Sequence, residues 1–210
     1  RAPVGSMAHT SIDLIVFDLG GVLVELGGVQ RMMEWTGAKW SLPDLWRRWL
    51  TSPAVREFES GRLGEDDFAR QLISEFELPV DTAAFRREFG SWVKGAFPGV
   101  APAVERLARS FKLAILSNTN PVHWRKIADE MGFVHHFHYT FLSCKTGLFK
   151  PDPEAYRNIL RATGCPAGRT LYFDDQQVNV DGALAVGMQA RRVSGIAGVR
   201  EALGAMGLAP

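Results

Sequence analysis

Short apolar runs separated by longer amphipathic segments set the pattern of this chain. The first run, Ile12–Phe17, is apolar at every position except Asp13 and is soon followed by Gly20 and Gly21, which is typical of a strand covered on both faces. Comparable runs occur farther along, at Leu113–Leu116, Tyr139–Leu142, Leu171–Phe173 and, more weakly, Ala190–Val193. These runs predict the strands of one parallel sheet.

Helical patterns fill the intervals between these runs. Apolar positions recur there at helical spacing, in the segments Pro102–Arg109, Pro121–Met131, Pro153–Ala162 and Val178–Val186. Glycines stand where these helices are expected to end, as at Gly132, Gly164 and Gly187. The alternation predicts a Rossmann-like α/β fold, in which a parallel sheet with helices on both faces binds ligands at the carboxyl ends of its strands.

The segment from Leu26 to Ala96 interrupts this alternation and has the pattern of helices only. Its apolar residues form two stripes, one of Phe68, Leu72 and Phe76 and the other of Phe85, Phe89, Trp92 and Val93. Gly64 precedes three acidic residues that suit the first turn of a helix. We therefore predict a core domain of residues 7–25 and 97–210, and an all-helical, mobile cap domain of residues 26–96 over the strand ends.

Composition narrows the class of protein without naming an activity. The chain has 210 residues, 46% hydrophobic and 22% charged, which suits one soluble domain with an insertion. A net charge of +1, with scattered basic residues, gives no reason to expect nucleic acid or a membrane surface as partner. Two cysteines, Cys144 and Cys165, and no run near the roughly 18 apolar residues of a membrane span favour a cytoplasmic protein. Residues 1–6 are expected to be a cleavage scar.

Polar residues that carry chemistry follow four of the predicted strands. Asp18 follows the first strand, Ser117 and Asn118 the second, Lys150 lies downstream of the third, and Asp174-Asp175 ends the fourth. Because parallel strands end at one edge of a sheet, these groups are expected to meet. A carboxylate can attack phosphorus, clustered carboxylates suit Mg²⁺, and a lysine with a serine hydroxyl can hold phosphoryl oxygens.

Four motifs in this order and spacing resemble those of the haloacid dehalogenase-like hydrolase superfamily. They are VFDLGGVL, ILSNTN, LFKPDPEAY and YFDDQQVNVDGA. The resemblance covers nearly the whole chain after Met7 and includes an insertion of the small helical cap type, whose segment FESGRLGEDDF also resembles the family. Within the superfamily, the chain is most similar to the group with a sugar-1-phosphate phosphatase and the phosphatase domain of soluble epoxide hydrolase.

The resemblance implies roles for the residues that would handle the phosphoryl group. Asp18 would be the nucleophile, and Lys150 would bridge that nucleophile and the phosphate. Ser117 would hydrogen-bond the phosphoryl oxygens, and Asn118 would line their pocket.

The resemblance also implies a Mg²⁺ site. Asp18 would be a metal ligand as well as the nucleophile, and Gly20 would contribute its backbone carbonyl. Asp175 would bind the ion directly or through water, with Asp174 and Asn179 in support.

One position departs from the family pattern. Most phosphatases of this superfamily have an aspartate two residues after the nucleophile, which protonates the leaving oxygen and then activates water, but this chain has Gly20. General acid–base help is worth about 10² to 10⁴ in rate. Three explanations remain open: a substrate with a good leaving group, another acid such as Glu25, or a protein that binds phosphorylated ligands without hydrolysing them.

The sequence therefore predicts a Mg²⁺-dependent phosphatase that hydrolyses a small phosphorylated metabolite through an aspartyl-phosphate intermediate. The resemblance favours a sugar phosphate as the substrate. The alternatives are a haloacid dehalogenase and a catalytically silent phospholigand-binding protein. The oligomeric state stays open. The three histidines at 135, 136 and 138 lack neighbouring ligands and are expected to flank a strand instead of binding metal. The tryptophans at 35, 46, 49 and 92 are expected in the cap core, with one or two facing the substrate.

Overall fold

A five-stranded parallel sheet organises the protein. The computed structural model describes residues 11–208, so the expected scar at 1–6 and the first core residues, 7–10, lie outside the described part. The strands are β1 (Leu14–Phe17), β4 (Lys112–Ser117), β5 (Tyr139–Leu142), β6 (Thr170–Asp174) and β7 (Gln189–Arg192). Their order is β5-β4-β1-β6-β7, which places β1 in the centre, paired in parallel with β4 and β6.

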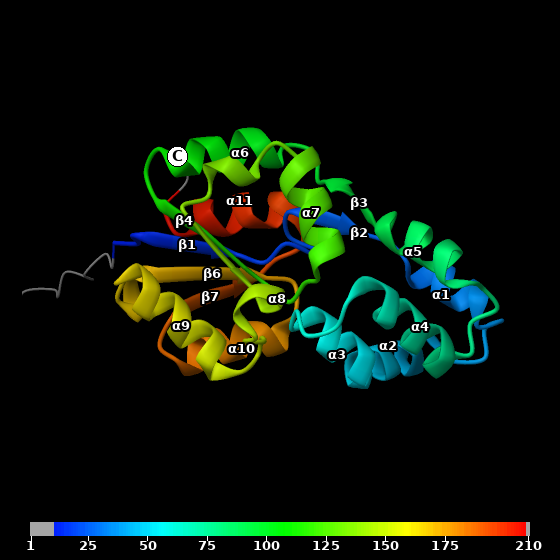
Figure 1. Ribbon diagram of the computed structural model, residues 1–210. Helices are drawn as coiled ribbons and strands as arrows, with labels where there is room; N and C mark the ends of the chain where they lie inside the picture. Colours follow the sequence, from blue (N-terminus) through cyan, green and yellow to red (C-terminus); the bar gives the residue numbers. More distant parts are fainter. Residues whose placement is uncertain (1–10, 209–210) are drawn as a thin grey trace, which may run out of the picture.

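Helices cover both faces of this sheet (Figure 1). One face carries α6 (Val100–Ala108), α7 (Pro121–Glu130) and α11 (Gly195–Ala205), and the other carries α9 (Pro153–Thr163) and α10 (Gln177–Ala185). Successive residues of β1 alternate between the two resulting cores, because side chains of a strand point to opposite faces. All four residues of β1 are buried, which explains its unbroken apolar run. The predicted α/β fold class is confirmed.

Five helices inserted after the first strand build a separate aromatic core. They are α1 (Val29–Trp35), α2 (Leu42–Thr51), α3 (Pro53–Glu59), α4 (Glu65–Phe76) and α5 (Thr82–Gly90). Phe58 of α3 stacks on Phe68 of α4 with their ring centroids 4.1 Å apart, and Phe85 and Phe89 of α5 complete the cluster. These inserted helices lie at one end of the sheet, on the right in Figure 1.

The prediction of helices only from Leu26 to Ala96 is wrong at both ends of that segment. Val24–Leu26 and Val93–Ala96 form an antiparallel two-stranded sheet, β2 and β3, which links the core to the inserted helices. Trp92 and Val93 follow α5, which ends at Gly90, although both side chains are buried. A strand of three or four residues is too short for a clear local period, and its partner lies far away in sequence.

Two further α-helices were not predicted. The short helix α8 (Ser143–Thr146) follows β5. Helix α11 packs Ile196, Val199 and Leu203 against the same face of the sheet as α6 and α7. Helix α11 contains three glycines, which lower its intrinsic helix propensity and mask its apolar stripe. Trp46 also departs from the expected cap core, because it is 45% exposed.

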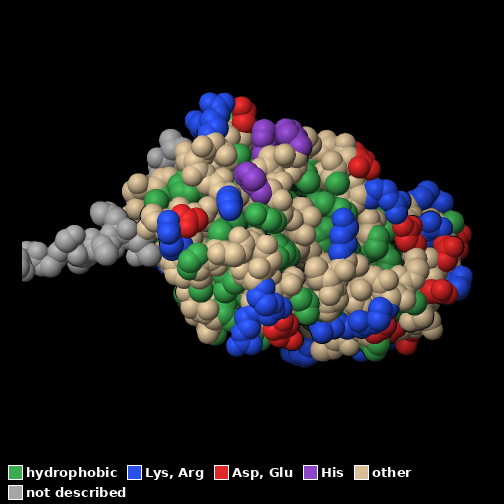
Figure 2. Space-filling view, turned by 60° about the vertical axis from the view of Figure 1, so that its left-hand side comes forward, with side chains coloured by type: hydrophobic (Ala, Val, Ile, Leu, Met, Phe, Trp, Pro, Cys, Tyr) green, Lys and Arg blue, Asp and Glu red, His purple; other side chains and the backbone are tan. Residues whose placement is uncertain are grey.

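The surface is mixed in charge. On the face that Figure 2 shows, lysine and arginine side chains lie among acidic, apolar and other side chains. Within residues 11–208, no helix combines the length and the hydropathy that a membrane crossing needs.

Candidate active site

The predicted site residues converge at the carboxyl ends of the central strands. Asp18 follows β1 directly, Ser117 ends β4 and Asp174 ends β6. One carboxylate oxygen from each of Asp18, Asp174 and Asp175 lies within 4.8 Å of the others. Residues more than 150 positions apart in sequence therefore meet because their parallel strands are neighbours.

Lys150 joins two of these carboxylates. Its ammonium Nζ lies 2.8 Å from Oδ1 of Asp18 and 2.7 Å from Oδ2 of Asp174. The Lys150 side chain is only 3% exposed, so both ion pairs are shielded from bulk water. The ammonium group of Lys150 is therefore held beside Asp18, unlike that of a solvent-exposed lysine.

Asp174 is held by protein donors. Besides Lys150, it accepts hydrogen bonds from the hydroxyl of Tyr172, from Nδ2 of Asn179 at 3.1 Å to each oxygen, and from the backbone N–H of Gln176 at 2.8 Å. Asp175 accepts one side-chain bond, from Nε2 of Gln176 at 3.0 Å. The different environments make Asp174 an anchor for Lys150, while Asp175 keeps lone pairs for another ligand.

Asn118 fixes the main chain of Lys150. Its Oδ1 accepts the backbone N–H of Lys150 at 2.9 Å, and its Nδ2 donates to the Lys150 carbonyl at 3.0 Å. This pair of bonds ties the end of β4 to the loop that carries the lysine. Ser117, immediately before Asn118, is 4% exposed and lines the same cavity.

The turn after Asp18 depends on its glycines. Gly21 has a φ of +73°, and a Cβ there would lie 2.5 Å from Oδ2 of Asp175, so a side chain would be strained and would displace the carboxylate. Gly20 differs, since a Cβ at this position would meet only the flexible end of Leu26, with Cδ1 at 2.7 Å. The space that a side chain at position 20 would enter is therefore taken by Leu26.

Burial sets the charges in this cluster. Burial raises the pKa of Asp18 to about 7, against the opposing field of Lys150, and the charge of Asp174 adds to the rise. Burial also raises the pKa of Asp175. For Asp174, burial is outweighed by the charge and hydrogen bond of Lys150 and by its other donors, which lower the pKa. When all three acids are ionised, they carry two negative charges more than Lys150 neutralises.

This charge imbalance fits a divalent cation. Clustered carboxylate oxygens are the ligands that Mg²⁺ prefers, and a bound cation would favour the ionised forms of Asp18 and Asp175, which burial disfavours. The donor set is thus suited to hold such an ion beside Asp18. The three histidines at 135, 136 and 138 lie elsewhere, in the segment that precedes β5.

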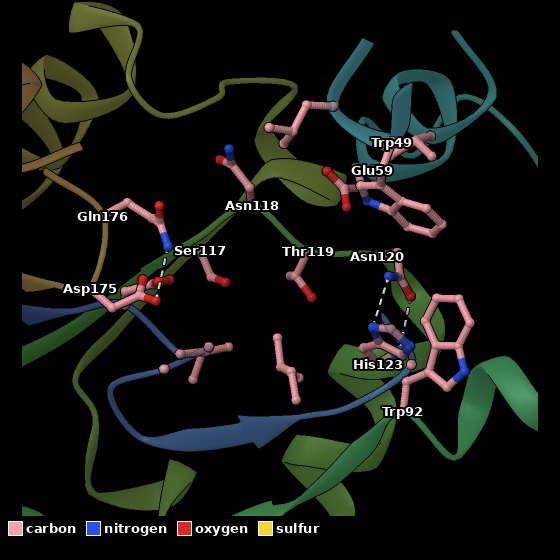
Figure 3. Close-up of a pocket in the computed structure, with 18 of the residues that line it drawn as sticks. Trp49, Glu59, Trp92, Ser117, Asn118, Thr119, Asn120, His123, Asp175 and Gln176 are labelled. Carbon is pink, nitrogen blue, oxygen red and sulfur yellow. Dashed lines mark hydrogen bonds between the residues drawn. The ribbon is translucent and has the colours of Figure 1, made fainter. Parts of the chain in front are cut away.

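A cavity of about 720 Å³ opens from the carboxylate cluster towards the inserted helices. Its polar end contains Asp18, Ser117, Lys150 and Asp175. The other end is mostly apolar, with side chains from β2 and the inserted helices that include Leu26, Met32, Trp46, Trp49, Leu50 and Trp92. Figure 3 shows Asp175 and Gln176 on one side of this space and Trp49, Glu59 and Trp92 on the other. Glu25 also lines the cavity, from the exposed side of β2.

Several residues that shape the site were missed in the sequence. Tyr172 lies two positions before Asp174, so strand alternation alone places both on one face and could have identified it. The hydroxyl of Ser143 accepts the N–H of Thr119 and donates to its carbonyl, at 2.9 and 3.0 Å, and its position after β5 was an available signal.

His123 was also missed, and no local pattern marks it. Its Nε2 lies 2.9 Å from the carbonyl of Phe89, which can only accept, so Nε2 carries the proton and Nδ1 accepts from Asn120. Burial lowers the pKa of His123 to about 4, which keeps the ring neutral. The histidine therefore connects α7 to the end of α5 as an uncharged hydrogen-bonding group.

Comparison with known proteins supports the sequence motifs. The profile of the haloacid dehalogenase-like hydrolases matches residues 12–187. The chain belongs to the haloacid dehalogenase-like hydrolase family. It is 30% identical to phosphatase MT3486 of Mycobacterium tuberculosis over 86% of both chains. It is also 29% identical to the sesquiterpene phosphatase astK of Aspergillus oryzae, over 85% of this chain and 88% of that one. The predictions of this superfamily and of a hydrolase are confirmed.

Solved structures share the fold of this hydrolase. The family enzyme BT-2542 of Bacteroides thetaiotaomicron, determined with magnesium and inorganic phosphate, superposes with a TM-score of 0.74 at 20% identity, over 88% of this chain and 95% of that one. The L-2-haloacid dehalogenase RSc1362 superposes with a TM-score of 0.67 at 27% identity, over 87% and 86%. The fold is therefore shared by an L-2-haloacid dehalogenase and by a family enzyme determined with magnesium and inorganic phosphate.

Proposed function

We propose that this hydrolase is a Mg²⁺-dependent phosphatase that cleaves a small phosphate ester through an aspartyl phosphate on Asp18. The observation that carries the proposal is the buried cluster in which Lys150 contacts Asp18 and Asp174, with Asp175 beside them. The names of its relatives support the same class of reaction.

The residues at the polar end of the cavity would have different roles in the reaction. A carboxylate oxygen of Asp18 attacks phosphorus and forms an acyl phosphate as the bond to the leaving oxygen breaks. Lys150 and the hydroxyl of Ser117 hold the phosphoryl oxygens and stabilise their developing charge. Asn118 keeps Lys150 in place through its main chain. Water then hydrolyses the acyl phosphate and restores Asp18.

Asp18, Asp175 and the backbone carbonyl of Gly20 would hold the Mg²⁺ ion, with Asp174 and Asn179 supporting them. When bound, the ion supplies positive charge to the phosphoryl oxygens. The fit of the donor set supports this assignment, as does the magnesium and phosphate content of the BT-2542 structure, which shares the fold.

The lining of the cavity bears on the organic group of the substrate. The sequence resemblance favours a sugar phosphate as the substrate, and a sugar ring could stack on Trp46 or Trp49. The part of the lining that comes from β2 and the inserted helices is nevertheless rich in exposed apolar side chains, including Leu26 at 53%, Trp46 at 45% and Leu50 at 77% exposure. Such a wall favours a phosphate ester with a substantial apolar face. The inserted helices would act as a cap that encloses this group and excludes water.

A dehalogenase is the second candidate, because a halide leaves without protonation and Gly20 would then be no handicap. The similarity to RSc1362 is consistent with this reaction. The cluster of Asp174 and Asp175 with Asp18 favours the phosphatase instead, since a metal-free dehalogenase has no use for the extra carboxylates.

Removal of the metal tests the proposed function. Purified protein treated with EDTA and then dialysed is expected to lose hydrolysis of para-nitrophenyl phosphate and to regain it with added Mg²⁺. The measurement is the release of inorganic phosphate, in parallel with the release of chloride from L-2-chloropropionate. Chloride release that persists in EDTA, without phosphatase activity, would establish the dehalogenase. A protein that binds phosphate but hydrolyses neither compound would be the silent ligand-binding form.

A further inference from the structure

Glu59 is a carboxyl group in the active-site cavity to which the proposed reaction assigns no role so far. It is the last residue of α3 and lines the cavity that also contains Asp18, Ser117 and Lys150. Figure 3 shows its carboxyl oxygens turned from the inserted helices towards the side of Asn118 and Thr119. The side chain is half-buried, so its carboxyl group reaches the cavity while protein surrounds its stem.

The carboxyl group of Glu59 is left without a cationic partner within residues 11–208. Arg56 lies one turn earlier on α3, at a spacing that allows an ion pair. Its guanidinium instead lies over the ring of Phe149, 3.7 Å from the centroid, next to Lys150 in the chain. Burial outweighs the field of Arg56 and raises the pKa of Glu59 to about 7. A group of this kind can both donate and accept a proton near neutral pH.

Close packing fixes the turn that carries Glu59 against the core. Gly61 has a φ of +76°, and a Cβ there would lie 2.3 Å from the backbone carbonyl of Cys144 in α8. Only glycine allows this approach. Helix α8 leads into the loop of Phe149 and Lys150, so the contact connects Glu59 to the loop that supplies the phosphate-binding lysine.

The other titratable and charged groups around Glu59 do not neutralise the charge of its carboxylate. Arg56 faces it from its own helix, and Cys144 faces it from α8, with a thiol whose pKa burial raises. Lys145, also on α8, lies with its Nζ 5.5 Å from the ring of Trp124. The remaining titratable residues of the cavity wall are Asp18, Glu25, His123, Lys150 and Asp175.

We propose that Glu59, from the inserted helices, is the general acid and base that replaces the carboxylate missing at Gly20. This inference rests on the proposed phosphatase function. In the first step Asp18 bonds to phosphorus, the bond from phosphorus to the leaving oxygen breaks, and that oxygen takes the Glu59 proton to become an alcohol. In the second step water attacks the aspartyl phosphate and gives its proton to the Glu59 carboxylate, which releases phosphate and restores both acids.

Glu59 is better placed for this role than Glu25. Glu25 lies on the exposed face of β2, where bulk water solvates its carboxyl group. The Leu26 side chain occupies the space that a side chain at position 20 would enter, so β2 offers an apolar group where the family pattern has its acid. The proton donor would therefore come from the opposite wall of the cavity.

The substitution Glu59→Gln tests the proposal, with hexyl phosphate and para-nitrophenyl phosphate as substrates. The alkoxide of hexanol is a poor leaving group, so we expect kcat/KM for hexyl phosphate to fall about 10²- to 10³-fold. The value for para-nitrophenyl phosphate should change less than about threefold, because nitrophenolate leaves without a proton. In the unsubstituted protein, kcat/KM for hexyl phosphate should decline above about pH 7, as Glu59 loses its proton, and this decline should disappear in the variant.

The matched control is Glu57→Gln, the same change two residues earlier, at an exposed side chain that pairs with Arg62. Thermal unfolding of both variants checks their folding. Equal hexyl phosphate activity in the Glu59 and Glu57 variants would overturn the proposal, and so would loss of that activity in Glu25→Gln alone. Hydrolysis of the aryl phosphate but not of hexyl phosphate by the unsubstituted protein would also overturn it. These outcomes leave the proposed phosphatase function standing, whereas absence of all Mg²⁺-dependent phosphate release would overturn that function itself.

Restoring the family pattern provides a rescue. Gly20→Asp combined with Leu26→Ala, which clears the space for the new side chain, should return hexyl phosphate activity to Glu59→Gln by at least about tenfold. A triple variant no more active than Glu59→Gln would contradict a proton-transfer role, because both proteins carry the same substitution at position 59 and differ in whether an acid stands at position 20.

Discussion

Replacement of Asp18 by asparagine is expected to lower kcat for para-nitrophenyl phosphate by about 10⁴-fold or more. The asparagine side chain has nearly the same shape, but its amide cannot attack phosphorus to form the acyl phosphate. The measurement is the steady-state rate with saturating Mg²⁺. The matched control is Asp13→Asn, a partly exposed acid that precedes β1 and pairs with Arg169. Retention of a tenth or more of the activity in Asp18→Asn would remove Asp18 from the chemistry.

The same substitution separates function from stability. The folded-state pKa of Asp18 is about 7 and its ordinary value is 3.8, so the folded state binds the proton more tightly. The stability that this proton contributes is present below the ordinary value and is lost as the pH rises through about 7. Metal-free Asp18→Asn should therefore unfold at a higher temperature than the unsubstituted protein at pH 8, and Mg²⁺ should reduce the difference. A lower unfolding temperature in the variant would contradict this electrostatic account.

Replacement of Lys150 by methionine is expected to reduce both activity and stability. The change leaves Asp18 and Asp174 buried without their cation, which should lower the free energy of unfolding by about 3–5 kcal/mol at neutral pH. Loss of a charge that stabilises the phosphoryl oxygens should lower kcat/KM by about 10³-fold. Urea unfolding and initial rates measure the two effects.

The control for this variant is Lys112→Met, at the exposed first residue of β4, which is the end of the strand away from Ser117 and the site. The stability difference between the Lys150 variant and the unsubstituted protein should shrink in acid, because Asp18 and Asp174 then become neutral. A variant as stable as Lys112→Met at neutral pH would show that the buried ion pairs do not hold the cluster together.

The sheet and the convergence of the site residues could be predicted from the sequence. Both follow from local apolar patterns and from the rule that parallel strands end at the same edge of a sheet. A strand buried on both faces has to be apolar throughout, as β1 is, and parallel strands place their ends at one edge. Asp18, Lys150, Asp174 and Asp175 therefore converge as the motifs imply. The prediction that Asn118 lines the pocket was incomplete, since its side chain holds the main chain of Lys150.

Features that depend on contacts between distant segments could not be predicted. The pairing of Glu25 in β2 with Gly95 in β3 joins residues 70 positions apart, and each strand is too short for a readable period. The position of Glu59 in the cavity depends on the close approach of Gly61 to Cys144. Helical periodicity in the insertion predicts its aromatic core, but it does not specify how that core sits on the sheet.

The most direct test of the account is whether Asp18 becomes phosphorylated during turnover. Protein quenched in acid while it hydrolyses para-nitrophenyl phosphate with Mg²⁺ would be digested and analysed by mass spectrometry. We expect one phosphoryl group on the peptide that contains Asp18, and none on that peptide from Asp18→Asn or from protein quenched in EDTA. A phosphoryl group on a different residue, or full hydrolysis by Asp18→Asn, would contradict the proposal that this hydrolase works through an aspartyl phosphate.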